Sequence, residues 1–223
     1  MQPIFAMQQK FMRIAVIATG AQKQEWLQKP VPANAEIIFI DAIVDIGNIQ
    51  ADIFFHLSFD ETNTEFIDTD KPVFASAVIT VLDSLPANYI RINAWNGFFK
   101  RDLMEVVAAE KNKQTVKTVM QAFNWKYIFA PDVPGMIAAK TISMIINEAY
   151  FAFGDEVSTK EEIDTAMKLG TNYPYGPFEW GEKIGLQKIY MLLNRLFTNE
   201  TRYAAAPLLL QEATEKLRIQ NDK

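Results

Sequence analysis

The 223-residue sequence contains no cysteine and a single histidine, His56, and these two scarcities remove several classes of function. Without cysteine there is no disulfide framework, no thiolate nucleophile and no cysteine-rich zinc site. One histidine is too few for a site that holds a metal through several imidazoles. We therefore expect no resident metal and no chemistry that begins at sulfur.

Clustered positive charge and long apolar runs are also missing. The net charge is −5, whereas nucleic acids and anionic membrane surfaces attract clusters of lysine and arginine. The longest candidate for a membrane span, residues 136–153, is interrupted by Lys140, Asn147 and Glu148. The first eleven residues lack the basic start and apolar stretch of a secretory signal. We expect a soluble, cytoplasmic protein that binds neither nucleic acid nor membrane.

Enough apolar material is present for two modest domains. Hydrophobic residues make up 49% of the chain and charged residues 22%, as is typical of globular proteins. Between residues 12 and 95, short apolar runs are separated by polar or glycine- and proline-bearing breaks. Runs without strict alternation are typical of strands covered on both faces, as in parallel α/β sheets. The runs are MRIAVIA, EIIFI, DIFFHLSF, PVFASAVI and YIRINAW.

Parallel strands need crossover connections, which are usually helical. Residues 22–28 could start one, and residues 102–109 and 114–123 are better candidates. From residue 132 onward the pattern is helical alone. The chain therefore divides into a shortened, mostly parallel α/β domain over residues 12–131 and an all-α domain over residues 132–223.

The all-α domain has clear helix boundaries. Residues 136–153 predict a long, mostly buried helix that ends at Gly154. Residues 158–168 predict a second helix with a left-handed C-cap at Gly170. Its start has two capping-box spacings, Ser158 with Glu161 and Thr159 with Glu162.

Three further helices follow. Pro177 is suited to a first helical position and Gly185 to the far end of the same helix. Residues 187–197 and 207–219 complete a domain of about five helices.

Short motifs in the all-α domain keep a specific order and spacing. They are Pro134-Gly135, Asn147-Glu148-Ala149, Glu162-Ile163-Asp164 with Ala166-Met167, Gly170, and Tyr173-Pro174-x-Gly176-Pro177-Phe178-Glu179. In this order they resemble the C-terminal domain of the 3-hydroxyacyl-CoA dehydrogenases, a type of domain similar to that of 6-phosphogluconate dehydrogenases. The resemblance implies a Rossmann-like N-terminal domain, NAD as cofactor, acyl-CoA ligands of fatty acid metabolism, and a homodimer formed through the helical domain.

The resemblance also implies where a dinucleotide would bind. The family's first strand leads into a Gly-x-Gly-x-x-Gly turn, whose glycines let the backbone approach the pyrophosphate. Here the turn reads Ala18-Thr19-Gly20-Ala21-Gln22-Lys23, and only Gly20 remains. Lys23 can offer its charge to a phosphate, and Asp41 stands where the fingerprint places the ribose-binding acid. Gly20, Lys23 and Asp41 are the candidate NAD contacts, although a turn that merely joins strand and helix fits them as well.

The family's catalytic histidine falls on Asn93, and its glutamate partner on Glu105, when Asn93-Ala94-Trp95-Asn96-Gly97 and Leu103-Met104-Glu105-Val106-Val107 are matched to the family. Oxidation of a hydroxyl group needs a base that takes the hydroxyl proton, and histidine suits this task because its pKa lies near 7. An asparagine amide cannot accept that proton, although it can still hydrogen-bond a ligand.

Two more family positions have lost their polar groups. Ile79 replaces a substrate-binding serine and Ala139 replaces an asparagine. The helical excursion that the family inserts after its second strand is a short loop between Asp41 and Ala51. These changes favour lost dehydrogenase activity, and the lost excursion indicates a substrate cleft that is smaller, more open or absent.

His56 and a set of four aromatic residues allow two interpretations each. His56 ends a strand at the edge where α/β proteins bind ligands, so it is either a substitute base or a hydrogen-bonded sheet-edge histidine. Trp95, Phe98, Phe99 and Trp125 either line a pocket or pack in the core, and core packing is favoured.

Three functional hypotheses follow. The leading one is a catalytically inactive 3-hydroxyacyl-CoA dehydrogenase-like protein, a pseudoenzyme kept as a dimeric binding or assembly module. The second is an active NAD-dependent oxidoreductase of this type, with an altered substrate and a rearranged site that uses His56 or Lys23. The third is a nucleotide or acyl-CoA sensor that binds without chemistry.

Overall fold

The computed structural model describes residues 11–221 apart from residues 42, 44–45, 47–48 and 60–64, and it describes only the backbone beyond residue 215. The expected N-terminal extension and much of the short loop after Asp41 lie outside these residues. The chain divides into two compact units. The sheet unit comprises residues up to 77, 82–94 and 98–129, and the helical unit comprises residues 78–81, 95–97 and 130 onward. The sequence had assigned residues 78–81 and 95–97 to the first domain.

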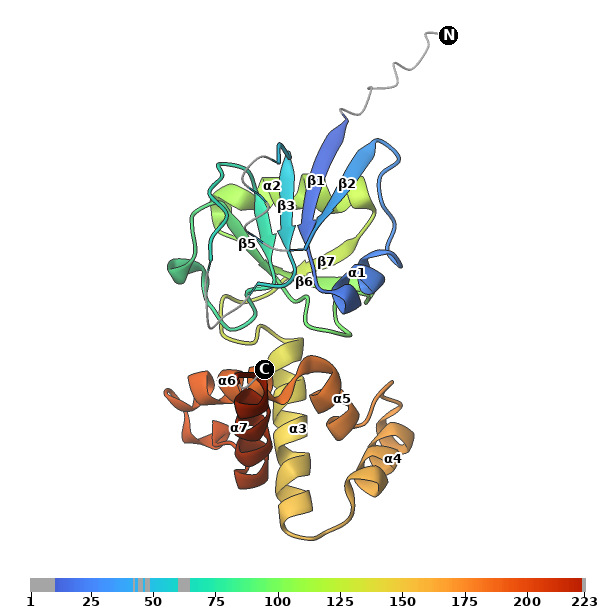
Figure 1. Ribbon diagram of the computed structural model, residues 1–223, viewed down its shortest axis with the longest axis vertical. Coiled ribbons are helices and arrows are strands. Elements are labelled where there is room, and N and C mark those ends of the chain that lie inside the picture. Colours follow the sequence, from blue (N-terminus) through green and yellow to red (C-terminus); the bar gives the residue numbers. More distant parts are fainter. Residues whose placement is uncertain (1–10, 42, 44–45, 47–48, 60–64, 222–223) are drawn as a thin grey trace. The chain divides into compact units, whose positions relative to one another are not determined.

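Among the described residues, the sheet unit contains a seven-stranded sheet in the order β2-β1-β3-β4-β5-β6-β7 (Figure 1). Every neighbouring pair is parallel except β5 and β6. The five predicted strand runs are confirmed. The strands are β1 (Met12–Ile17), β2 (Ala35–Ile40), β3 (Ile53–His56), β4 (Val73–Ala75), β5 (Tyr89–Ile92), β6 (Leu103–Val107) and β7 (Lys126–Phe129).

The strand order reverses direction at β1. The chain passes from β1 through helix α1 (Gly20–Trp26) to β2 on one side, and then returns to place β3 on the other side of β1. In α/β sheets, ligands bind outside the carboxyl ends of the strands at such a reversal. We call the carboxyl ends of β1 and β3 the switch point.

The two faces of the sheet are covered differently. Helices α1 and α2 (Lys113–Phe123) cover one face, where α2 buries Val116, Val119, Met120 and Phe123 at helical spacing. Connecting segments cover the opposite face, with residues such as Ile43 and Leu85 packed against its apolar cluster. The favoured core interpretation of the aromatic group is confirmed, since its members are at most 5% exposed: Trp95, Phe98, Phe99 and Trp125.

The predicted helix over residues 102–109 is wrong, because this segment contains strand β6, which runs antiparallel to β5. A short apolar run does not distinguish a buried strand from a helix, and the β-branched Val106 and Val107 favour the strand. Strand β7 was not predicted. It is a four-residue edge strand with mostly exposed side chains, although its Tyr127-Ile128-Phe129 run consists of residues that favour strands.

In the helical unit the expected set of about five helices is confirmed. Helix α3 packs against α5, α6 and α7 and lies at the centre of the unit (Figure 1). No helix in the described part of the chain is long and apolar enough to cross a membrane. The helices are α3 (Ala138–Gly154), α4 (Lys160–Thr171), α5 (Pro177–Ile184), α6 (Leu186–Phe197) and α7 (Pro207–Asn221).

The boundaries of α4 differ in part from the prediction. Thr159 is the N-cap and forms the expected capping box with Glu162. The C-cap prediction at Gly170 is wrong, because the helix continues through it and Asn172 takes the left-handed conformation at φ 55°. Asparagine tolerates this conformation better than most residues do.

Candidate functional site

The first turn after β1 is held together by its own side chains. Thr19 is the N-cap of α1, and its hydroxyl oxygen accepts the Gln22 backbone N–H at 3.4 Å. In return, the Thr19 backbone N–H donates to Gln22 Oε1 at 3.0 Å. This reciprocal arrangement is a capping box. It occupies two N–H groups of the segment in which the dinucleotide fingerprint needs donors for a pyrophosphate.

Gln22 also crosses the switch point. Its side chain is buried at 2% exposure, and Nε2 donates to the Leu57 carbonyl at 2.6 Å and to the Ala94 carbonyl at 3.3 Å. One carboxamide thus links the start of α1 to the segments that follow β3 and β5. Sequence reasoning missed this residue, although the Thr-x-x-Gln spacing from Thr19 is a visible capping-box signal.

The side chains of the three candidate NAD contacts take no part in the hydrogen bonds that Thr19 and Gln22 form. A Cβ built on Gly20 meets nothing within 4 Å, so packing does not require glycine there. The Lys23 ammonium lies over the Phe39 ring, 4.6 Å from its centroid, where a cation is attracted by the ring. Asp41 is exposed beyond the end of β2. Two of the turn's N–H groups already have partners within the turn, and Ala18 and Lys23 stand where the fingerprint has glycines, so the residues present do not fit a bound pyrophosphate well.

The structure brings Asn93 and Glu105 together. Antiparallel pairing aligns Ile92 with Val106, and the Asn93 backbone N–H donates to the Glu105 carbonyl at 3.4 Å. The two residues therefore lie opposite each other at one end of the β5 and β6 pair. Glu105 belongs to a strand, so its expected place in a helix is wrong. Asn93 is buried at 4% exposure and its carboxamide does not titrate.

His56 ends β3 in an apolar setting. Its ring lies edge-on to Phe59 with centroids 5.4 Å apart, and within the described residues Nδ1 has no hydrogen-bond partner. The sequence left open that His56 is a hydrogen-bonded histidine at the sheet edge. Its Nδ1 atom does not form such a hydrogen bond. Burial lowers the pKa of His56 from 6.5 to about 4. The imidazole is accordingly neutral at neutral pH and is a weak base.

Ile79 and Ala139 both lie in the helical unit. They are 8% and 0% exposed, respectively, and neither side chain can form a hydrogen bond. Their segments meet where the Gly135 backbone N–H donates to the Val78 carbonyl at 2.8 Å. Gly135 has φ +81°, and an added Cβ would lie 2.9 Å from Leu192 Cδ2. The Pro134-Gly135 motif is therefore a requirement of this close packing.

The motif from Tyr173 to Glu179 also has an architectural explanation. Both Asp164 carboxylate oxygens cap α5, one accepting the Phe178 N–H at 2.8 Å and the other the Glu179 N–H at 3.1 Å. Burial raises the pKa of Asp164. Only glycine fits at position 176, because a Cβ there would lie 2.3 Å from Asp164 Oδ1. Phe178 then packs edge-on to Tyr150, with centroids 4.9 Å apart.

The Asn147-Glu148-Ala149 motif joins α3 to the segment before α7. Asn147 is buried at 2% exposure; its Nδ2 donates to the Ala204 carbonyl at 2.9 Å and its Oδ1 accepts the Ala206 N–H at 2.8 Å. Glu148, the charged member of the motif, is exposed.

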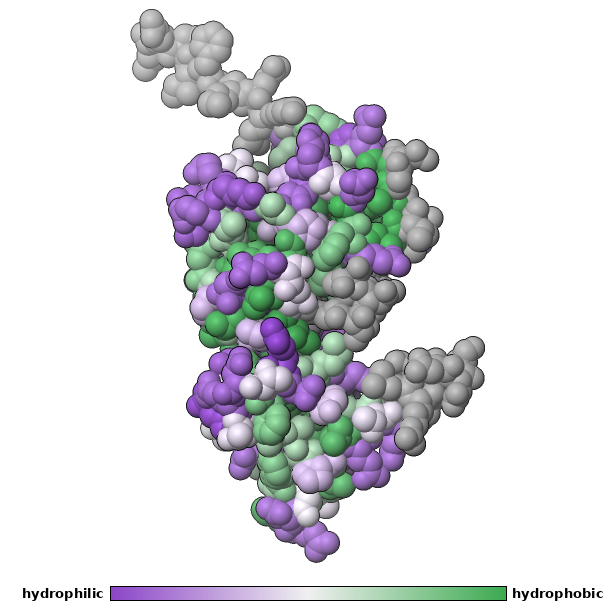
Figure 2. Space-filling view, turned by 90° about the vertical axis from the view of Figure 1, so that its left-hand side faces the viewer, coloured by the Kyte–Doolittle hydropathy of each residue, from purple (hydrophilic) through white to green (hydrophobic). Residues whose placement is uncertain are grey.

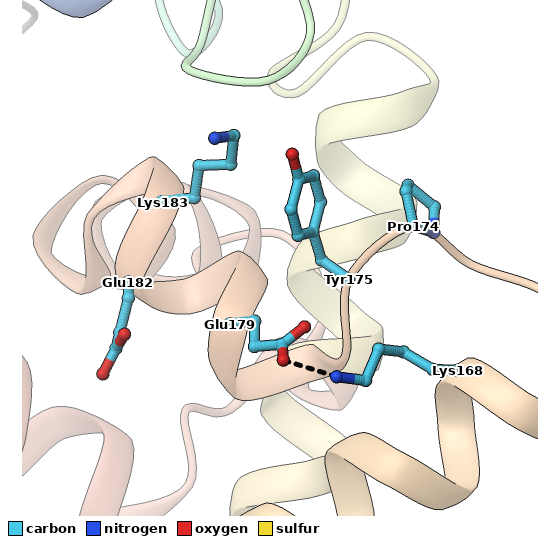
Figure 3. Close-up of a pocket in the computed structure, with 6 residues that line it drawn as sticks. All are labelled: Lys168, Pro174, Tyr175, Glu179, Glu182 and Lys183. Carbon is cyan, nitrogen blue, oxygen red and sulfur yellow. Dashed lines mark hydrogen bonds and ion pairs between the residues drawn. The ribbon is translucent and has the colours of Figure 1, made fainter.

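A shallow hollow of about 610 Å³ lies in the helical unit (Figure 3). Figure 3 shows the Lys183 amine and the Tyr175 hydroxyl pointing in the same direction, whereas Glu182 points away. Lys168 Nζ pairs with Glu179 at 2.5 Å. Because lysines and glutamates line the hollow in equal number, it does not favour ligands of one charge. The lining residues are Lys168, Pro174, Tyr175, Glu179, Glu182 and Lys183.

In the described residues, no group of three or more histidine, aspartate or glutamate side chains is arranged to hold a metal ion. A mostly parallel sheet with a switch point, followed by a helical domain built around one long central helix, defines a two-domain protein with a shortened Rossmann-like domain and an all-α domain.

Comparison with known proteins identifies the family. Residues 135–223 match the model of the 3-hydroxyacyl-CoA dehydrogenase C-terminal domain. The chain is 45% identical over 103 residues to 3-hydroxyadipyl-CoA dehydrogenase of Escherichia coli, which covers 45% of this chain and 20% of that protein. It is 33% identical over 180 residues to 3-hydroxybutyryl-CoA dehydrogenase of Clostridioides difficile, which covers 77% of this chain and 63% of that protein. The chain therefore spans less than two thirds of either relative.

A solved structure shows the same fold across both units. The (S)-3-hydroxybutyryl-CoA dehydrogenase of Ralstonia eutropha superimposes with a TM-score of 0.64 at 15% identity, covering 93% of this chain and 95% of that chain. The helical unit belongs to the family of 3-hydroxyacyl-CoA dehydrogenase C-terminal domains, and the whole chain is related to these dehydrogenases.

Proposed function

We propose that this chain is a 3-hydroxyacyl-CoA dehydrogenase-like protein without dehydrogenase activity, kept as a dimeric binding or assembly module. One observation carries the proposal: a buried carboxamide, Asn93, lies opposite Glu105, and the resemblance assigns to Asn93 the position of the family's histidine. A carboxamide cannot take the hydroxyl proton that must leave when a hydroxyl group is oxidised to a ketone. Glu105 is thereby left without the imidazole that it would orient.

The surroundings supply no substitute base. His56 has a pKa of about 4 because it is buried, so it is poorly matched to proton abstraction near pH 7. The Lys23 ammonium lies over Phe39. Ile79 and Ala139 lack the hydrogen-bonding groups that a substrate oxygen or thioester would need. These features favour an inactive protein over the alternative, an active NAD-dependent dehydrogenase with an altered site.

We expect no oxidation of NADH by the purified chain in the presence of acetoacetyl-CoA, and none by Asn93→His. The single change restores a base but leaves Ile79 and Ala139 unable to bind the substrate. The measurement is the loss of NADH absorbance over hours at high enzyme concentration. The triple variant Ile79→Ser, Asn93→His, Ala139→Asn is the matched comparison. Turnover by the wild type would overturn the proposal, and turnover by Asn93→His would show that positions 79 and 139 were matched wrongly to the family.

Calorimetric titration with acetoacetyl-CoA separates the two kinds of module. Saturable binding without turnover indicates an acyl-CoA sensor, in which Asn93 holds the ligand by hydrogen bonding. An absence of binding favours an assembly role, in which protein contacts alone are retained.

The dimer part of the proposal concerns the surface of the helical unit. The apolar face offered by residues 189–197 is largely used within the unit, since Ile189, Leu192, Leu193 and Leu196 are buried. Other apolar side chains lie at the surface, with Leu169 82% exposed and Val157 70% exposed. Figure 2 shows apolar residues among polar ones on this surface. We propose that a second copy covers these exposed apolar side chains and removes them from water.

We expect a molecular mass about twice the 25.4 kDa of one chain when the protein is examined by light scattering after size-exclusion chromatography. Leu169→Glu should raise the monomer fraction, because it places a charge in the contact surface. Leu27→Glu is the control, since Leu27 is 61% exposed in the sheet unit. A single-chain mass at every concentration would refute the dimer.

A further inference from the structure

The switch point of the sheet unit is spanned by a side chain of the chain itself. We infer that Gln22 closes the dinucleotide position of this Rossmann-like domain, so that the protein binds neither NAD nor NADH. The inference goes beyond lost turnover, because a protein without a catalytic base can still bind the cofactor.

The first step concerns the space at the carboxyl ends of the strands. A dinucleotide in this class of fold lies across the strand ends at the reversal of strand order. Gln22 Nε2 bridges the Leu57 carbonyl at 2.6 Å and the Ala94 carbonyl at 3.3 Å, and the side chain is 2% exposed. The bridge therefore runs from the first turn across the switch point to the end of β5.

The second step concerns the donors. A pyrophosphate is bound by backbone N–H groups at the helix start that have no other partner. The Thr19 N–H is taken by Gln22 Oε1 and the Gln22 N–H by Thr19 Oγ1. Gln22 and Thr19 thus occupy two of the turn's N–H donors with each other's side chains, and the same Gln22 side chain spans the strand ends. Its carboxamide uses its oxygen on the turn and its nitrogen on the strand ends, so both of its polar ends are satisfied.

The third step is that α1 is anchored against movement. Trp26, at the other end of the helix, is 1% exposed and stacks on Phe99 with ring centroids 5.6 Å apart. A Glu25 carboxylate oxygen accepts the Lys100 N–H at 3.2 Å. Opening the switch point requires either moving a helix held at both ends or rotating Gln22 away from two buried carbonyls. Leaving such carbonyls without a partner is costly.

The test measures binding and is independent of turnover. NADH is titrated into the wild-type chain and followed by its fluorescence and by calorimetry, with ADP-ribose as competitor. We expect no saturable signal up to millimolar NADH. A one-to-one, ADP-ribose-sensitive signal would overturn the inference. That result without NADH oxidation would leave the inactive dehydrogenase proposal standing, so the two ideas fail separately.

Two variants test whether Gln22 is the residue that prevents NADH binding. Ala18→Gly with Lys23→Gly restores the three-glycine spacing around Gly20 and keeps Gln22; we expect this double variant to stay without NADH binding. Adding Gln22→Ala to it should give the saturable NADH binding that the double variant lacks. Equal binding by the double and triple variants, both folded by circular dichroism, would show that Gln22 is not the barrier and would overturn its role.

Discussion

Replacing Trp26 by alanine should destabilise the protein by about 3–5 kcal/mol, the range for truncating a large buried aromatic side chain. Trp26 is 1% exposed and is the centre of an aromatic cluster. Its ring stacks on Phe99 at an interplanar angle of 11° and lies edge-on to Phe55 and Trp125, with centroid distances of 4.9 and 5.4 Å. Alanine leaves a cavity between α1 and the sheet that these rings cannot fill by small shifts.

Trp26→Phe is the matched control, and it should cost far less than Trp26→Ala. The indole Nε1 is buried without a hydrogen-bond partner among the described residues, so phenylalanine removes an unsatisfied donor as well as some packing. Urea unfolding followed by circular dichroism gives the free energies, and amide hydrogen exchange in β3 assigns the loss to the sheet unit. Equal costs for the two variants would show that aromatic packing at this site contributes little.

Much of the fold could be predicted because its signals are local. The helix that starts at Pro177 and ends at Gly185 follows from backbone preferences of two residues. The capping box of Thr159 and Glu162 is likewise a contact between residues three apart. Strand β6 was misread because a five-residue segment with four apolar residues carries no clear period, and its identity is set by pairing with β5, which lies elsewhere in the chain. Asn172 replaced Gly170 as the helix end because local preference allowed both.

The candidate site was harder to predict than the fold. The sequence placed Asn93 and Glu105 as a pair, and the antiparallel register does set them opposite each other. Gln22 was missed because its closeness to the Ala94 carbonyl is a property of the folded sheet, since the two residues are 72 positions apart in the sequence. The charge of Lys23 suggested a phosphate contact, but the Lys23 ammonium lies over the Phe39 ring on β2. No pattern in the sequence indicates this contact.

The effect of pH on stability should be dominated by His56 between pH 6.5 and about 4. His56 is the single histidine of the chain, and burial lowers its pKa from 6.5 to about 4. Protonation therefore favours the unfolded chain, in which the imidazole is solvated. The resulting stability is fully present above pH 6.5 and is lost as the pH falls toward 4. The difference between the two pKa values corresponds to about 3 kcal/mol.

His56→Gln isolates this contribution, because the amide does not titrate. Carboxylates titrate at the lower end of this pH range. Salt-bridging lowers the pKa of Glu179, so the stability that this group contributes is lost as the pH falls below 4.5, the ordinary pKa of a glutamate. Burial raises the pKa of Asp164, so its effect on stability has the opposite sign. Both groups remain in the variant and cancel from the comparison. Urea unfolding at half-unit steps from pH 7 to pH 4 should show the wild type converging on the variant by about 3 kcal/mol. Parallel profiles would mean that the imidazole of His56 is solvated in the folded protein.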